Sequence, residues 1–262
     1  MEAGNRMKPM TLGPYDHYVY AAIALGGSFL AAWFLLWVTL RSPWVEEIRT
    51  YRGMSPPFLG VVGVLFALTL AFLANDTWNA HDRALNTVYQ EGEALRGIRS
   101  MAAALPETSG RAVNAAVGDY ARVTIDEDWP LLARRLSSRQ AAERLDDLSA
   151  LLAGGDMAAT LPTAVHAQML GLAAQVRAAR GQRIALSQTH VNPLKWLGMA
   201  GLGFLTMVSI AMVHVDQVRA EILAVLIFAA AAAPTAAIVL VQGNPFQPPT
   251  VVSAAPIETV LR

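Results

Sequence analysis

Residues 53–75 read GMSPPFLGVVGVLFALTLAFLAN, a run without Asp, Glu, Lys or Arg that decides the fold class. As an α-helix, these 23 residues cover about 35 Å at about 1.5 Å per residue, enough to cross a hydrocarbon core of about 30 Å. Three other stretches also lack these four residue types: residues 18–40, 196–215 and 222–257. The sequence therefore predicts an all-α membrane protein with four transmembrane helices.

A polar stretch separates the second span from the third. Residues 76–195 hold 13 of the 20 Lys and Arg residues, and the stretch is long enough to fold as a domain. Its apolar residues recur at steps of three and four, and no alternating pattern indicates strands. We expect a helical bundle with helices over residues 76–105, 111–126, 139–152 and 161–188, and a short segment starting at residues 128–130.

These patterns divide the chain into four segments. Residues 1–75 hold the N-terminal segment and transmembrane helices 1 and 2, residues 76–192 the cytoplasmic helical bundle, residues 193–243 transmembrane helices 3 and 4, and residues 244–262 a C-terminal tail. Pro106 is expected to end the first bundle helix, and Pro234 to kink the fourth span.

The orientation follows from the Lys and Arg residues near the span ends, which are enriched on the cytoplasmic side. Six lie on the side of the termini and the bundle, and four lie opposite: Arg6, Lys8, Arg83, Arg180, Arg183 and Lys195 against Arg41, Arg49, Arg52 and Arg219. This excess predicts that both termini and the bundle are cytoplasmic.

Composition and spacing argue against several classes of function. With no cysteine, the chain has no disulfide, no thiolate nucleophile and no sulfur-based zinc site. Its five histidines are scattered, none in an HExxH or comparable metal spacing. A net charge of zero without a Lys/Arg-rich block argues against nucleic acid. We expect no enzyme, no cofactor and no metal site.

A basic series marks the last bundle helix, where Arg177, Arg180 and Arg183 recur at every third residue. Such a series is most often a solvated face paired with acids, here Glu91 or Glu93. The functional alternative is an electrostatic funnel that concentrates anions near a pore mouth. The sequence leaves both interpretations open.

The junction at residues 70–83, LAFLANDTWNAHDR, resembles the bestrophin-like family of bacterial membrane proteins and, more distantly, the bestrophin anion channels. Further landmarks of the family follow in order: Glu91, Glu93, Tyr120, Asp128-Trp129-Pro130, Arg180-Gly181-Gln182-Arg183, Pro193 to Trp196, and Asn244-Pro245-Phe246. The resemblance covers residues 18–261, nearly the whole chain.

The resemblance implies a homo-oligomer, with a pentamer favoured, in the bacterial inner membrane, with the second spans around a pore. In bestrophins, bulky apolar residues at four-residue spacing on span two form a constriction. The matching positions in this chain are Gly60, Val64 and Leu68, and Asn75 is the candidate pore-lining residue at the rim. The candidate vestibule residues are Arg83, Arg177, Arg180 and Arg183. Gly60 departs from the bulky pattern, and the calcium-sensing acidic cluster of animal bestrophins has no recognisable counterpart.

Our leading hypothesis is a bestrophin-like oligomeric ion channel that conducts anions through an apolar constriction on span two. The rival is a non-conducting membrane scaffold or accessory subunit that docks a protein partner through the bundle. A third hypothesis is a membrane receptor with the bundle as its sensor. The sequence names neither the ion nor the partner.

Overall fold

The computed structural model describes residues 16–51, 55–188 and 193–262, which contain helices and no strand. Arg6, Lys8 and Arg52, used above to predict the orientation, lie outside the described residues. The chain divides into two compact units. Unit 1 comprises the described residues of Met1–Thr77 and Val191–Gly243, and unit 2 those of Trp78–His190 and Asn244–Arg262.

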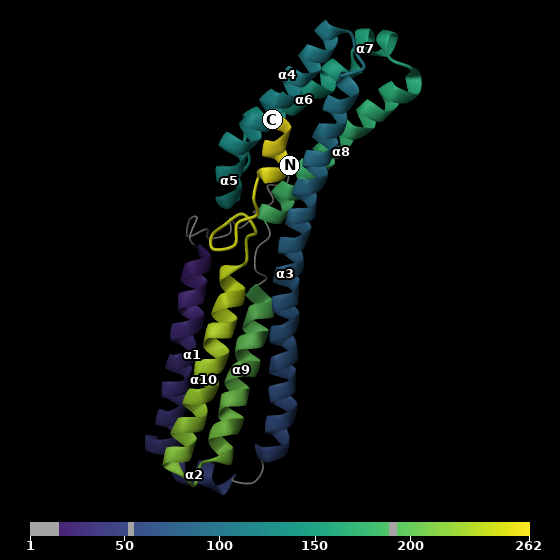
Figure 1. Ribbon diagram of the computed structural model, residues 1–262. Coiled ribbons are helices and arrows are strands. Elements are labelled where there is room, and N and C mark those ends of the chain that lie inside the picture. Colours follow the sequence, from purple (N-terminus) through teal and green to yellow (C-terminus); the bar gives the residue numbers. More distant parts are fainter. Residues whose placement is uncertain (1–15, 52–54, 189–192) are drawn as a thin grey trace, which may run out of the picture. The chain divides into compact units, whose positions relative to one another are not determined.

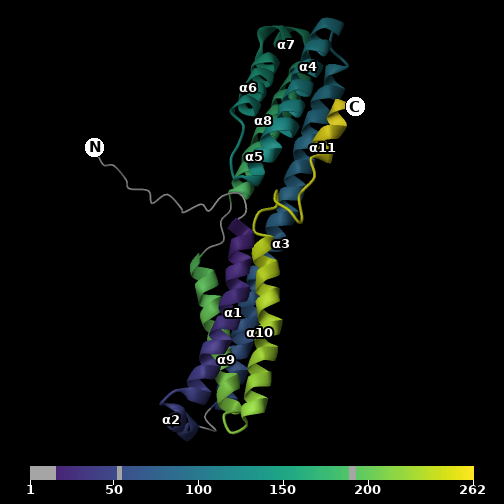
Figure 2. The same cartoon turned by 90° about the vertical axis from the view of Figure 1, so that its left-hand side faces the viewer.

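Unit 1 contains the predicted spans. Its elements are α1 (Asp16–Arg41), the short α2 (Val45–Thr50), the first part of α3 (Ser55–Ala102), α9 (Pro193–Val213) and α10 (Val218–Val241). Among the described helices, α1, α3, α9 and α10 are long and apolar enough to cross a membrane, which confirms the four-span prediction. Figures 1 and 2 show α1, α9 and α10 running side by side. The helix continues through Pro234, which lies inside α10.

Small residues allow the spans to pack closely. Ala32 of α1 packs with Ala211 of α9 and Ala229 of α10, and all three are buried. The first part of α3 joins this bundle through Phe66. A Cβ atom added at Gly203 would lie 3.1 Å from the Phe66 ring, so a larger residue there would push α9 away from α3.

Unit 2 is the helical bundle. It contains the second part of α3, then α4 (Glu107–Val123), a π-helical turn (Thr124–Asp128), α5 (Trp129–Ala133), α6 (Arg139–Ala153), α7 (Gly155–Thr160) and α8 (Thr163–Ser187). The helix predicted over residues 161–188 corresponds to α8. Residues before it form α7, which the sequence analysis missed. The α3 helix ends at Ala102, before Pro106, and α4 begins at Glu107 rather than at residue 111.

The C-terminal segment belongs to the core of unit 2. It contains α11 (Ala255–Glu258) and a 3₁₀ turn (Thr259–Leu261). Phe246, Val252, Ile257 and Val260 are buried in the same apolar cluster as residues of α3, α4 and α8. The segment predicted as a tail is therefore a structural part of the bundle.

Candidate functional site

A buried ion pair connects two helices of unit 2 that are distant in sequence. Arg183 on α8 forms a bidentate ion pair with Glu91 on α3. Its Nε donates to Oε2 at 2.9 Å and its Nη2 donates to Oε1 at 3.1 Å. The hydroxyl of Tyr120, on α4, also donates to Glu91 Oε1, at 2.5 Å. Glu91 thus links α3, α4 and α8.

Asp128, at the end of the π-helical turn, extends this network. Arg183 Nη2 lies 3.2 Å from Asp128 Oδ2, and Arg180 Nε lies 3.2 Å from the same oxygen. The backbone N–H of Ser138 donates to Asp128 Oδ1 at 2.6 Å. Arg180 Nη2 donates to the Ser138 carbonyl at 2.8 Å. The network therefore also fixes the start of α6.

The network is electrically balanced and shielded from water. The side chains of Glu91, Asp128 and Arg183 are 0% exposed, and two carboxylates face two guanidinium groups. Buried charges are tolerated when they are paired and hydrogen-bonded in this way. The guanidinium of Arg183 also lies 5.1 Å from the centre of the Trp129 ring, within the range of a cation–π contact.

The network shifts the ionisation of two of its members. Burial raises the pKa of the Tyr120 hydroxyl well above its usual value, and the negative charge of Glu91 raises it further, while Arg183 opposes the shift. Burial alone would lower the pKa of Arg183, but Glu91, Tyr120 and Asp128 raise it, and the net shift is upward. Tyr120 therefore stays protonated and Arg183 stays charged at neutral pH.

The structure separates the three arginines of the basic series. Arg177 is exposed and binds Asp146 Oδ1 at 2.6 Å, whereas Arg180 is nearly buried and Arg183 fully buried. Steps of three residues turn by about −60° on a helix, so the series passes from the surface of α8 to its buried side. Arg183 does pair with Glu91, as the solvated-face interpretation proposed. However, neither Arg180 nor Arg183 lies on a solvated face or an open funnel of this chain.

The candidate pore residues of span two lie on the outside of unit 1. Val64 is 58% exposed and Leu68 50% exposed, and Gly60 has open space where a Cβ atom would stand. Asn75 is exposed as well. This face of α3 therefore does not pack on the other spans of its own chain and is available to lipid or to another copy.

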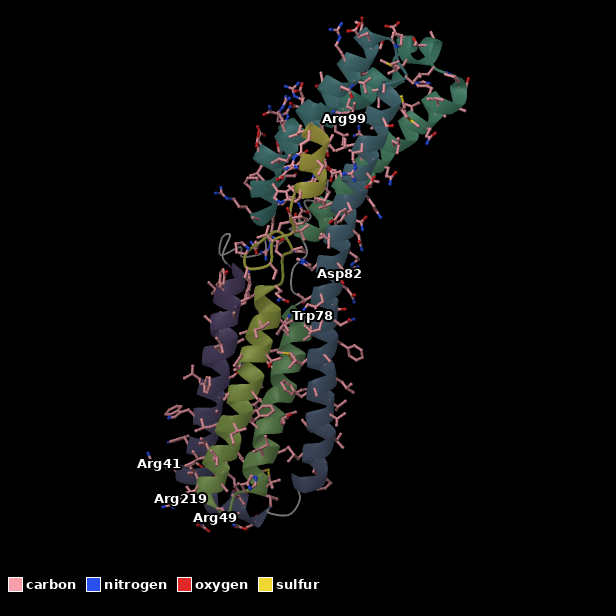
Figure 3. All side chains as sticks on the ribbon, viewed as in Figure 1. Arg41, Arg49, Trp78, Asp82, Arg99 and Arg219 are labelled. Carbon is pink, nitrogen blue, oxygen red and sulfur yellow. The ribbon has the colours of Figure 1, made fainter. Side chains whose placement is uncertain are left out.

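In unit 2 one exposed face of α3 carries polar residues. Asn79, Asp82 and Asn86 recur at steps of three and four, which places them on one helical face. Arg83 is exposed beside them, and its Nε donates to the carbonyl of Asn79 at 3.1 Å. Figure 3 shows Trp78 and Asp82 along this part of α3. No group of three or more His, Cys, Asp and Glu residues suited to a metal ion occurs among the described residues.

Four membrane-spanning helices and an α-helical unit held together by a buried charge network define a multi-span helical membrane protein. A model of the Bestrophin-like domain matches residues 26–257. The chain belongs to the bestrophin-like family, which confirms the resemblance noted from the sequence.

Solved structures share the fold. A variant of a bacterial bestrophin homologue from Klebsiella pneumoniae superposes with a TM-score of 0.66 at 14% identity, covering 93% of this chain and 97% of that one. A second variant of a Klebsiella pneumoniae homologue gives 0.62 at 16% identity, covering 93% and 95%. A structure described as a membrane protein gives 0.64 at 16% identity, covering 92% and 95%. No curated protein sequence matches the chain.

Proposed function

We propose that this protein forms a homo-oligomeric ion channel of bestrophin type. The observation that carries the proposal is the exposed apolar face of α3 in unit 1, with Val64 and Leu68 turned away from the core of their own chain. Membership of the bestrophin-like family and the shared fold support the same function. A ring of such helices, five in the pentamer that the resemblance favours, would enclose a pore.

In this pore, Val64 and Leu68 form the constriction. Rings of apolar side chains gate ion flow because water leaves them readily. Gly60, one turn before Val64, contributes no side chain, so the narrow part is limited to two rings. Asn75 offers an amide to the ion at the rim.

Our first proposal for the ion is an anion. It rests on Arg83 as the vestibule cation, because Arg180 and Arg183 are buried and Arg177 is paired with Asp146. One observation favours cations as the second candidate. The exposed face of α3 in unit 2 carries Asp82 between Asn79 and Asn86, and a ring of carboxylates selects cations.

Channel function is tested by ion flux into liposomes that contain the purified protein. Leu68→Ala should raise flux, because it widens the constriction. Leu30→Ala on α1 is the matched control, since Leu30 is also an exposed leucine of a span, 66% exposed, and should leave flux unchanged. Flux that is absent from the wild type and both variants would contradict the channel and leave the scaffold hypothesis, in which unit 2 docks a protein partner.

The sign of the ion is tested by the reversal potential across a salt gradient. Arg83→Gln should reduce anion preference, whereas Asp82→Asn should increase it. The second proposal would replace the first if the wild-type reversal potential showed a preference for cations and Asp82→Asn moved that potential toward zero.

The proposed location is the bacterial inner membrane, with unit 2 and both termini in the cytoplasm. The proposal is supported by the excess of Lys and Arg near the corresponding span ends. Reporter fusions after Gly155 and after Val215 should report opposite sides of the membrane. Translocation of the fusion after Gly155 would place unit 2 outside and favour the receptor hypothesis.

A further inference from the structure

The C-terminal part of unit 2 begins directly behind a membrane span. The span α10 ends at Val241, and Asn244 is the first residue of unit 2 after it. Three residues of extended chain reach at most about 10 Å. The headgroup layer is about 5–8 Å thick on each side of the hydrocarbon core. The chain therefore keeps Asn244 in or next to the lipid headgroups.

The end of α5 is held against this segment by two hydrogen bonds. Asn244 Nδ2 donates to the carbonyl of Leu132 at 3.3 Å, and Gln247 Nε2 donates to the carbonyl of Ala133 at 2.5 Å. Residues 134–136, Arg-Arg-Leu, follow immediately. These three residues therefore belong to the part of unit 2 that lies near the membrane surface.

The same three residues form the turn that ends α5. The N–H of Arg135 donates to the Leu132 carbonyl at 3.0 Å, and the N–H of Leu136 donates to the Leu131 carbonyl at 2.9 Å. This pair of bonds is the Schellman ending of a helix, in which glycine is the usual residue at the position of Arg135. Arg135 has a φ of 61°, which is unfavourable for a residue with a side chain. The turn itself favours glycine, so the arginine is explained by its side chain and not by the backbone.

The turn carries more positive than negative charge. Many surface arginines of unit 2 pair with an acid: Arg96, Arg111, Arg122, Arg139, Arg144 and Arg177. Arg134 is exposed and forms no ion pair within the part of the chain that the structure describes. Glu127 reaches the turn, where its Oε2 accepts from Ser138 Oγ at 2.8 Å. Arg134 and Arg135 outnumber this one acid.

Large apolar side chains are exposed in the same part of unit 2. Leu136 is 56% exposed. Val251, on the segment that follows α10, is 46% exposed, and its neighbour Val252 donates its N–H to the Pro245 carbonyl at 2.9 Å. Arginines next to exposed aliphatic residues are typical of protein surfaces that lie in the membrane interface.

We propose that Arg134, Arg135 and Leu136 bind the membrane surface at anionic lipids. The two guanidinium groups bind headgroup phosphates, which accept paired hydrogen bonds from arginine, and Leu136 enters the upper part of the acyl chains. The contact makes the position of this turn depend on the charge of the lipids. It is separate from the exposed face of α3, so it does not depend on ion conduction.

The test uses the full-length protein, whose lack of cysteine allows one introduced cysteine to be labelled specifically. Ser137→Cys, at an exposed position next to Leu136, receives an NBD fluorophore. The protein is placed in nanodiscs of phosphatidylcholine, with or without phosphatidylglycerol, that contain doxyl-labelled lipid as a quencher. Quenching should be strong with phosphatidylglycerol and weak without it. High salt should reduce the quenching, because salt screens the attraction between arginine and phosphate.

Ala159→Cys on α7 is the matched control for the label. Ala159 is exposed, and Figures 1 and 2 show α7 at the end of unit 2 opposite to the segment that follows α10. A fluorophore at this position should not be quenched in either type of nanodisc. Both leaflets of a nanodisc have the same composition, so the result does not depend on the orientation of the protein.

The charge variants are made in the Ser137→Cys protein. Arg134→Gln should raise the fraction of phosphatidylglycerol needed for half-maximal quenching about fivefold, since one arginine near a membrane surface contributes about this factor. Arg135→Asn should weaken the contact as well, because asparagine accepts a positive φ but carries no charge. Arg144→Gln removes an exposed charge of α6 instead and should leave quenching unchanged. If Arg135→Asn does not fold, the exposed position Arg134 decides.

Three results would overturn the proposal. The first is equal quenching with and without phosphatidylglycerol, which would mean that the turn does not distinguish anionic lipids. The second is unchanged quenching in Arg134→Gln. The third is the absence of quenching in both types of nanodisc, which would mean that the turn does not reach the lipids or is covered by another copy of the chain.

Discussion

Replacing Glu91 by Gln tests whether the buried network holds unit 2 together. The substitution keeps the size of the side chain and removes its negative charge. In the native protein, Glu91 accepts hydrogen bonds from Tyr120 at 2.5 Å and from two nitrogens of Arg183 at 2.9 and 3.1 Å. After the substitution, Asp128 remains as the buried partner of Arg183, at 3.2 Å.

Removing one partner of a buried ion pair costs about 3–5 kcal/mol, and here it leaves the two guanidinium groups of Arg180 and Arg183 with the single carboxylate of Asp128. Glu93→Gln is the matched control on the same helix. Glu93 pairs with Arg96 on the surface, where its side chain is 67% exposed. Surface ion pairs contribute about 0–1 kcal/mol, so this control should change little.

Hydrogen exchange of backbone amides, read by mass spectrometry, measures the local opening of each unit. A loss of about 3–5 kcal/mol corresponds to exchange about 10²- to 10⁴-fold faster in peptides of α4 and α8. Peptides of α1 should be unchanged. The double variant Glu91→Met/Arg183→Met should exchange more slowly than Glu91→Gln, since it leaves no unpaired charge at this pair. Exchange in Glu91→Gln no faster than in Glu93→Gln would refute a stabilising role of the network.

Three further predictions concern unit 2. Gly92→Ala should detach α11 from α3, because the added Cβ would lie 2.5 Å from the Pro256 carbonyl oxygen. Limited proteolysis should then cleave the C-terminal segment. The control Gly181→Ala places its Cβ at a site with nothing within 4 Å and should leave the segment resistant to cleavage. Ile257→Ala should lower the free energy of unfolding by about 2–5 kcal/mol, measured by urea denaturation, because Ile257 is fully buried. Burial raises the pKa of Tyr120 in the folded protein. The stability that its neutral form provides is therefore complete below the unfolded pKa of about 10 and is lost as the pH rises toward the folded pKa. In the same assay, Tyr120→Phe should be less stable than the wild type at pH 8 but should lose less stability above pH 10.

The spans were predictable because the membrane imposes a simple rule on composition. A helix that crosses hydrocarbon can hardly contain charge, so four runs without Asp, Glu, Lys and Arg identify α1, the first part of α3, α9 and α10 as spans. The family was predictable from the order of short polar and aromatic landmarks. The helices of unit 2 before its C-terminal segment were also predictable in number and type, apart from α7 and the π-helical turn.

The place of the C-terminal segment was not predictable from its own residues. Residues 244–262 contain several prolines and form short elements without the regular apolar period of a long helix. Their burial depends on partners far away in sequence. Asn244 donates to the carbonyl of Leu132 at 3.3 Å, and the carbonyl of Val252 accepts from the Trp129 ring at 3.2 Å. Local patterns carry no signal for such contacts.

The buried network had a signal that periodicity alone could have detected. Glu91 lies three residues after Val88 and four before Leu95, so it occupies the apolar stripe of α3 rather than its polar side. Glu221 gives the same signal in α10, four residues before the buried Val225. An acid on an apolar stripe must be neutralised, but the stripe does not say how. In unit 2 the neutralising charge comes from α8, ninety-two residues along the chain from Glu91. In unit 1 the groups that act on Glu221 are Thr39 on α1, Arg49 on α2 and His214 between α9 and α10, so for both acids the partners lie outside the helix that carries the acid, where its own stripe cannot show them.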